Sequence, residues 1–270
     1  MPELDPAKQA VANTYNLASA GYNGRWLRFW TDSSRALIDA AGLEPGQRVL
    51  DLGTGTGEAA LAAAERVGKS GRVLGLDIAE EMLAEARKRS AGKNIEYRVH
   101  DIDRVDELTE KFDVVLSSHS IFFLPDMCGA LARVKKVVEP AGRLAVSTWG
   151  KSAFQPQSEM FRAAISKFPV KLPEKFGWQR IPDAPALKEL ISSAGFRNLE
   201  VSTKQLGYPL ADADAWWEIV WNSGFRGPVA QLSPADLEKF KAAHLAEISG
   251  MKGPEGIDLN LECHFAVATP

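Results

Sequence analysis

Residues 49–61 have the sequence VLDLGTGTGEAAL, an apolar run that enters a turn with glycines at 53, 55 and 57 and continues into an alanine-rich stretch. Glycine adopts positive φ without steric cost and lets a ligand approach the main chain closely, so we expect a strand, a ligand-binding turn and a helix. The dinucleotide fingerprint G-x-G-x-x-G would need a glycine where this chain has Glu58. Asp51 and Glu58 would oppose a diphosphate by on the order of several kcal/mol and would attract a cation. The alternative is a plain glycine-rich turn without a ligand.

Short apolar runs alternate with amphipathic stretches from Gln47 to Trp149, which is typical of strand–helix units in a parallel sheet. We therefore predict a doubly wound α/β fold, whose strand order the sequence leaves open. The strands are expected over 48–53, 72–77, 95–101, 112–118, 143–149, 198–206 and 261–269. Helices are expected over 58–68, 79–90, 159–167, 185–194 and 213–224 and from Ser233 onward, where serine caps and proline occupies the first turn.

Carboxylates also end the next two predicted strands. Asp77 lies at the end of the second strand, where doubly wound folds place an acid that accepts hydrogen bonds from ribose hydroxyls. Asp101 ends the third strand and is followed by the apolar Ile102, a combination that suits the amine and the ring face of an adenine. A single acid at such a place is more often a cap or a solvated turn residue. Three acids in consecutive strands beside the glycine turn favour a nucleoside site.

Composition excludes several classes of protein. The 270 residues carry 32 Lys and Arg against 35 Asp and Glu, a net charge of −3, which gives no basic field for nucleic acid. No apolar run approaches the roughly 20 residues that span a bilayer, and the first residues resemble neither a signal nor a transit peptide. The two cysteines, Cys128 and Cys263, imply neither a disulfide framework nor a zinc site. We expect a cytoplasmic protein without a metal. The sequence does not decide its oligomeric state, and a homodimer is one possibility.

Five segments carry a resemblance to a known family: VLDLGTGTGEAAL, LGLDIAEEMLAEA, HDID, FDVVLSSHSIFFLPD and GRLAVSTWG. They resemble the successive motifs of class I S-adenosylmethionine-dependent methyltransferases, in particular the ubiquinone/menaquinone-biosynthesis branch (methyltransferase type 11), over about Pro45–Gly150. The resemblance implies a Rossmann-like, mostly parallel seven-stranded sheet with a reversed last strand, together with helical cap insertions. It implies S-adenosylmethionine as the cofactor and a small molecule as the methyl acceptor.

The resemblance also implies a division of the chain. We expect an N-terminal helical segment over the site at 1–44, a cofactor-binding core at 45–207 and 257–270 with a loop and helix insertion at 151–183, and a helical substrate cap at 208–256. The methionine part of the cofactor would be held by Asp51, Gly53, Thr54, Gly55 and Gly57. Its ribose and adenine would be bound by Asp77, Ile78, Met82, Asp101 and Ile102. Ser118 would flank the methionine part, and the N-terminal segment would contribute Tyr22 and Trp30.

His119 follows the fourth strand, where the resemblance places residues that face the substrate. If the acceptor atom carries a proton, a base with a pKa near neutrality would assist methyl transfer, and His119 is the candidate. A lone histidine is at least as often a hydrogen-bonded structural side chain.

Aromatic side chains suggest an apolar acceptor site. The Phe122–Phe123 pair follows His119, and Trp149 ends the fifth predicted strand. Trp217 and Trp221 are neighbours on one helical face of the expected cap. Such stripes are often ordinary core, so substrate contact and packing are both open. The acceptor is expected to be mostly apolar or aromatic, with methylation at oxygen, nitrogen or carbon.

Two other functions remain open. A fold of this kind can bind S-adenosylmethionine without methylating, as a cyclase or a regulatory module would. An NAD(P)-dependent oxidoreductase is the weaker alternative, because none of the four tyrosines starts the Y-x-x-x-K pair of a short-chain dehydrogenase.

Overall fold

The computed structural model describes residues 4–270, so the first three residues of the expected segment 1–44 lie outside the described part. Its main sheet has seven strands in the order β3-β2-β1-β4-β5-β9-β6, and only β9 runs antiparallel to its neighbours. The predicted α/β class and the reversed last strand are therefore confirmed. The strands are β1 (Arg48–Leu52), β2 (Arg72–Asp77), β3 (Ile95–Val99), β4 (Phe112–Ser118), β5 (Val138–Trp149), β6 (Arg197–Gln205) and β9 (Glu262–Thr269).

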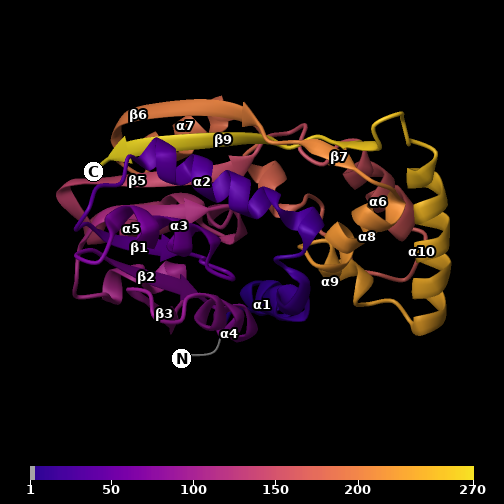
Figure 1. Ribbon diagram of the computed structural model, residues 1–270, viewed down its shortest axis with the longest axis horizontal. Coiled ribbons are helices and arrows are strands. Elements are labelled where there is room, and N and C mark those ends of the chain that lie inside the picture. The colour runs from indigo at the N-terminus through magenta and orange to yellow at the C-terminus, as the bar shows by residue number, and fades with distance from the viewer. Residues whose placement is uncertain (1–3) are drawn as a thin grey trace.

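The central strands form the core because both faces of the sheet are covered. Val49, Leu50 and Leu52 of β1 are fully buried, as the unbroken apolar run predicted. The sheet is packed between α2 (Phe29–Ala41), α3 (Glu58–Val67), α4 (Glu80–Arg89), α5 (Met127–Val137) and α7 (Ala184–Ser193) (Figure 1). Parallel strands of this kind end at one edge of the sheet, and the loops that follow β1 to β4 meet there.

The carboxyl-terminal third of the chain adds a helical region at one end of the molecule (Figure 1). It contains α8 (Ala213–Trp221), α9 (Arg226–Val229), α10 (Pro234–Ser249) and a small sheet of β7 (Tyr208–Leu210) and β8 (Ile257–Leu259), which the sequence did not predict. Helix α6 (Gln157–Ile165), from the stretch between β5 and α7, packs against α10. Helix α1 (Pro6–Ala18) lies against α4 and α9 and so joins the sheet domain to this region.

Most helix and strand positions agree with the sequence pattern, but α5 and the short α9 were not predicted and β5 begins earlier than expected. The predicted cap of α10 is confirmed, since the Ser233 hydroxyl accepts from the Asp236 backbone N–H and Pro234 opens the helix. Strand β5 begins at Val138 rather than at Arg143, because residues 139–142 form an irregularity within the strand instead of a turn before it. Within residues 4–270, no helix is long and apolar enough to cross a membrane.

The helical region has its own aromatic core around His244. The Trp216 indole donates from Nε1 to His244 Nε2 at 2.9 Å, while Phe240 stacks on the imidazole and Phe161 of α6 meets its edge. His244 is fully buried, and burial lowers its pKa to about 4. The imidazole is therefore neutral in the folded protein at neutral pH.

This burial predicts a specific acid sensitivity. Because the folded-state pKa of His244 lies below the unfolded value of about 6.5, the unfolded chain binds the proton first and stability falls as pH drops from about 6.5 towards 4. His244→Gln keeps an acceptor for Trp216 but does not titrate. Between pH 6 and 5 the free energy of unfolding, from urea denaturation, should fall by about 1 kcal/mol more in the wild type than in this variant. Equal pH slopes in the two proteins would contradict the assignment.

Candidate active site

The turn after β1 is built on three residues with positive φ: Gly53 at 65°, Gly55 at 55° and Gly57 at 85°. A Cβ at Gly53 would lie 2.4 Å from Ser120 Cβ, and one at Gly57 would lie 2.5 Å from the Tyr97 hydroxyl oxygen. Both positions therefore exclude a side chain by packing as well as by conformation. At Gly55 the nearest atom to such a Cβ is Met82 Cε at 3.4 Å, since this glycine lines a cavity.

Asp77, at the end of β2, holds this turn in place. Its Oδ2 accepts from the Gly55 backbone N–H and its Oδ1 from the Ala79 N–H, both at 2.8 Å. Burial raises the pKa of this carboxyl group, while the backbone donors oppose the shift. The glycine turn and the second strand end are thus joined by one carboxylate that still has free lone pairs for a ligand.

Asp51 is fully buried beside the same turn. Its Oδ2 accepts from the Thr54 hydroxyl at 2.6 Å, whereas its Oδ1 has no hydrogen-bond partner. Burial raises the pKa of Asp51 to about 7, and the neighbouring Asp77 adds to the shift. A buried carboxylate oxygen without a donor is costly, so this geometry favours a ligand that brings a cation or an N–H group.

Two other acids near the turn are already paired with cations. Glu58 accepts from the side chains of Arg89, Asn23 and Thr31, so the charge that distinguishes this turn from a dinucleotide fingerprint is balanced in the folded protein. Asp101 accepts from Lys8 Nζ of α1 at 2.7 Å, and its Oδ1 caps the following turn at the Asp103 N–H.

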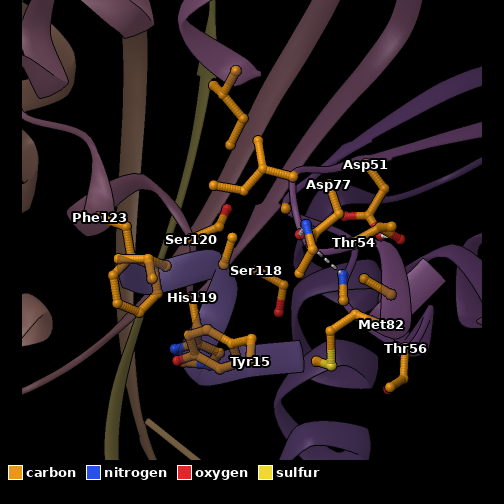
Figure 2. Close-up of a pocket in the computed structure, with 18 of the residues that line it drawn as sticks. Tyr15, Asp51, Thr54, Thr56, Asp77, Met82, Ser118, His119, Ser120 and Phe123 are labelled. Carbon is orange, nitrogen blue, oxygen red and sulfur yellow. Dashed lines mark hydrogen bonds between the residues drawn. The ribbon is translucent and has the colours of Figure 1, made fainter. Parts of the chain in front are cut away.

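Aromatic rings from the N-terminal segment and from the loop after β4 form the other side of the cavity. Tyr22 stacks on Trp30 with ring centroids 5.0 Å apart, and Tyr15 of α1 meets Tyr22 and Phe123 edge to face. In Figure 2, Phe123, His119 and Tyr15 lie on one side of the pocket and Thr54, Thr56 and Met82 on the other. The cavity thus has a carboxylate-rich end and an aromatic end.

His119 is held at the aromatic end in an unusual backbone conformation, with φ at 53°. Its ring stacks on Trp149 at 3.9 Å and meets the edge of Trp30 at 5.6 Å. Burial lowers the pKa of His119 to about 3, which differs from the near-neutral value expected of a general base. The reason is that no charged group accompanies the imidazole into this apolar environment. Nε2 lies 3.8 Å from Cys263 Sγ, and Nδ1 has no partner.

The structure brings most of the residues singled out from the sequence to one cavity, namely Tyr22, Trp30, Asp51, Gly53, Thr54, Gly55, Asp77, Ile78, Met82, Asp101, Ile102, Ser118 and His119. Five others lie outside its lining. Gly57 packs under Tyr97, Phe122 is buried behind Phe123, and Trp149 lies beneath His119. Trp217 and Trp221 of α8 pack together, with Trp217 also against Phe240, inside the helical region.

Several lining residues were not expected from the sequence, of which Lys8, Tyr15 and Ser120 are the most informative. Of the pair Phe122–Phe123, expected to belong to this wall, Phe123 lines the cavity and Phe122 does not. Lys8 and Tyr15 had no motif to reveal them, because α1 reaches the site only through the tertiary fold.

The residues present fit S-adenosylmethionine. Four acids line the cavity, Asp51, Glu58, Asp77 and Asp101, and one lysine, Lys8, faces them. Asp51 offers an unpaired oxygen beside a glycine turn, and Ile78, Met82 and Ile102 offer apolar contact at the adjoining strand ends. A cationic amino acid joined to a nucleoside matches this distribution, whereas a diphosphate would meet carboxylates.

Comparisons with known proteins agree with this chemistry. A family model described as a methyltransferase domain matches residues 43–184. Aklanonic acid methyltransferase from Streptomyces sp. (strain C5) is 36% identical over 63% of this chain and 72% of its own length. A ubiquinone/menaquinone biosynthesis C-methyltransferase from Vibrio vulnificus (strain YJ016) is 32% identical over 71% of this chain and 76% of its own length.

Solved structures show the same fold at low identity. The [4+2]-cyclase SpnF matches with a TM-score of 0.61 and 18% identity, over 98% of this chain and 97% of its own. A Haemonchus contortus phosphoethanolamine N-methyltransferase 2 in complex with phosphomonomethylethanolamine and S-adenosylhomocysteine matches with a TM-score of 0.58 and 19% identity, over 100% of this chain and 61% of its own. The family match spans just over half of the chain and includes the glycine turn and all three strand-end acids. The chain therefore belongs to the S-adenosylmethionine-dependent methyltransferases.

Proposed function

We propose that this enzyme transfers the methyl group of S-adenosylmethionine to an oxygen, nitrogen or carbon atom of a small, mostly apolar or aromatic metabolite. The observation that carries the proposal is the aromatic end of the cavity, where Tyr15, Tyr22, Trp30 and Phe123 surround the position next to His119. Sites for organic ligands are mostly apolar with a few placed polar groups. Two similar enzymes are named for aklanonic acid and for ubiquinone/menaquinone biosynthesis, which supports an acceptor of this class.

In this proposal the glycine turn and Asp51 bind the methionine part of the cofactor, helped by Thr54 and Ser118. Asp77 accepts from the ribose hydroxyls while it keeps its backbone donors, and Ile78, Met82 and Ile102 pack on the adenine. Asp101 acts at the adenine end together with Lys8, because the carboxylate is already bonded to that ammonium group. Gly57 contributes by letting α3 begin close to Tyr97 rather than by contact.

At the acceptor end, we propose that Tyr15 and Phe123 contact the acceptor, in place of Phe122. Trp149 supports the His119 ring from below, and Trp217 and Trp221 stabilise the helical region by packing. We propose that segment 1–44 covers the site, that 45–207 and 257–270 form the core with an insertion at 151–183, and that 208–256 is the cap. Helix α1 of the N-terminal segment contacts α9 of the proposed cap, which supports the proposal that both segments cover the same site.

Bound S-adenosylmethionine supplies an electrophilic methyl carbon. The protein's part is to align the acceptor with that carbon and to exclude water, which can account for much of the catalysis in an in-line transfer. His119 is neutral, so it acts at the acceptor through hydrogen bonding and shape rather than as a strong base.

We propose that the enzyme works in the cytoplasm on a free small molecule, and that it does not act on nucleic acid. Its net charge of −3 and its two cysteines outside any paired motif support this setting. A homodimer is compatible with the proposal and does not enter the chemistry.

A direct test is release of S-adenosylhomocysteine from S-adenosylmethionine in the presence of phenolic, quinone, prenylated and amine acceptors. Turnover is expected with aromatic acceptors. Turnover only with highly charged, non-aromatic acceptors would contradict the proposed class.

The Asp51 carboxyl group predicts pH-dependent cofactor binding. A ligand ammonium group beside Asp51 lowers its pKa from about 7, so binding strengthens as pH rises through 7 and releases a proton. The Kd for S-adenosylhomocysteine, measured by calorimetry, should be about tenfold higher at pH 6 than at pH 8, since each pH unit below the free pKa costs up to tenfold. Asp51→Asn should flatten this dependence. The exposed Asp39→Asn serves as control and should keep the wild-type profile, while a flat wild-type profile would refute the assignment.

Phe123 predicts a selective effect on the acceptor. The ring is half-buried and in the cavity, so Phe123→Ala should raise KM for an aromatic acceptor about tenfold, equivalent to roughly 1.4 kcal/mol of lost apolar contact, and leave the Kd for S-adenosylhomocysteine within twofold. Phe168→Ala removes a similarly half-buried ring away from the cavity and should change neither constant. If both variants behave alike, Phe123 does not contact the acceptor.

A further inference from the structure

Three buried polar atoms of cavity-lining residues lack hydrogen-bond partners within the described residues: Trp30 Nε1, Asp51 Oδ1 and His119 Nδ1. Buried polar groups are rarely left unpaired, and an exception in a cavity calls for a ligand. Asp51 lies at the carboxylate-rich end, where the methionine part of the cofactor is proposed to supply the missing donor to Oδ1. The other two atoms belong to rings that meet edge to face at 5.6 Å, at the aromatic end.

Trp30 offers a hydrogen-bond donor without ambiguity, because the indole Nε1–H cannot accept. Its ring is fixed between Tyr22, which stacks on it, and Phe29 and Trp149, which pack against it at an angle. The orientation of this N–H is therefore set before an acceptor arrives.

The role of His119 depends on which ring nitrogen carries its proton, and Cys263 decides this. Burial raises the pKa of the Cys263 thiol well above its usual value, so the sulfur keeps its proton. Imidazole nitrogen is a much better acceptor than a thiol sulfur, so the S–H donates to His119 Nε2 across 3.8 Å. Within residues 4–270, the other acceptor near Sγ is the His264 carbonyl oxygen, at 3.9 Å. Since the imidazole is neutral, its single N–H then sits at Nδ1.

Two N–H donors, from Trp30 and His119, thus stand unpaired on adjoining rings at the acceptor end. Donors without an acceptor favour an oxygen that only accepts, and hydrogen bonds to an ionised oxygen are the stronger ones. Among the described residues, Lys8 is the one lysine that lines the cavity, and it is bonded to Asp101 and Asp103, so it is not free to take this role.

We propose that the methyl acceptor carries an ionised oxygen, such as an enolate, phenolate or carboxylate, which Trp30 Nε1 and His119 Nδ1 bind together, and that Cys263 is the positioning residue that sets the His119 tautomer. This inference rests on the proposed function and narrows its acceptor. The ionised oxygen, or a carbon conjugated with it, donates an electron pair to the methyl carbon while the pair of the carbon–sulfur bond goes to sulfur. The acceptor's negative charge and the sulfonium charge cancel, so the transfer itself requires no proton removal by the protein. Where the methylated atom is an aromatic carbon that carries hydrogen, that proton moves afterwards to the oxygen through solvent, which restores the phenol.

The test uses two quinones of nearly equal shape on the full chain saturated with S-adenosylhomocysteine. 2-Hydroxy-1,4-naphthoquinone is ionised at neutral pH, and 2-methoxy-1,4-naphthoquinone is neutral. Calorimetry should show that the wild type binds the ionised quinone at least tenfold more tightly. Trp30→Phe, which keeps a ring but removes the N–H, should reduce that preference at least threefold. Trp178→Phe, a half-buried tryptophan outside the cavity, should leave it unchanged.

The outcomes separate the inference from the function on which it rests. Failure to bind S-adenosylhomocysteine would count against the proposed function. Firm binding of S-adenosylhomocysteine combined with equal affinity for both quinones, no binding of the ionised one, or full preference in Trp30→Phe would overturn the inference alone.

The role of Cys263 has its own readout in the ¹⁵N NMR spectrum of the histidine side chains, with the His119 signals assigned through His119→Gln. The wild type should show His119 protonated at Nδ1. Cys263→Ser, which retains a donor, should keep this tautomer, and Cys263→Ala should shift it towards Nε2–H. A wild-type imidazole protonated at Nε2 would refute the positioning role.

Discussion

The site depends on one constraint, the left-handed turn at the end of β1. With φ positive at Gly53, Gly55 and Gly57, the chain leaves the sheet and starts α3 within a few residues. Asp77 fixes the middle of this turn by accepting from Gly55 N–H, so the ends of β1 and β2 form one rigid surface. The loops after β3 and β4 then bring Asp101 and His119 to the same edge, because parallel strands all end there.

Charge is distributed unevenly over this surface. Glu58 and Asp101 are neutralised by Arg89 and Lys8. Asp51, which is buried, and Asp77, which is half-buried, have no cation beside them in the described part of the chain and rely on a hydroxyl and on backbone donors. Burial raises the pKa of both of these carboxyl groups, because the low dielectric disfavours their charged forms. A cationic ligand stabilises the charged forms, so these two side chains favour a cation at the turn. The charges that favour a cation are therefore those of Asp51 and Asp77, rather than those of Asp51 and Glu58 as first expected, because Glu58 is paired with Arg89.

Local patterns account for what could be predicted. Glycine spacing and acids at strand ends depend on residues close in sequence, so the carboxylate-rich end of the cavity was largely foreseen. The strands of the sheet domain were foreseen as well, and so were most of its helices, with α5 the exception. The aromatic end was foreseen less well. Tyr15 and Lys8 reach the site from a distant helix, and the very low pKa of His119 results from burial against Trp149, which no spacing encodes. The helical spacing of Trp217 and Trp221 is the same for substrate contact and for packing. The folded structure decides for packing, because Trp217 lies against Phe240 and neither tryptophan lines the cavity. The order of the strands in the sheet could not be predicted, because the hydrophobic periodicity of a strand does not show which strand lies next to it.

In this site, carboxylates around a glycine turn select a cationic nucleoside over a diphosphate. Calorimetric titration of the same protein with S-adenosylmethionine and with NADH measures this choice directly. We expect saturable one-to-one binding of S-adenosylmethionine and no measurable affinity for NADH. Firm binding of NADH, with no heat from S-adenosylmethionine, would show that the carboxylates do not make this selection.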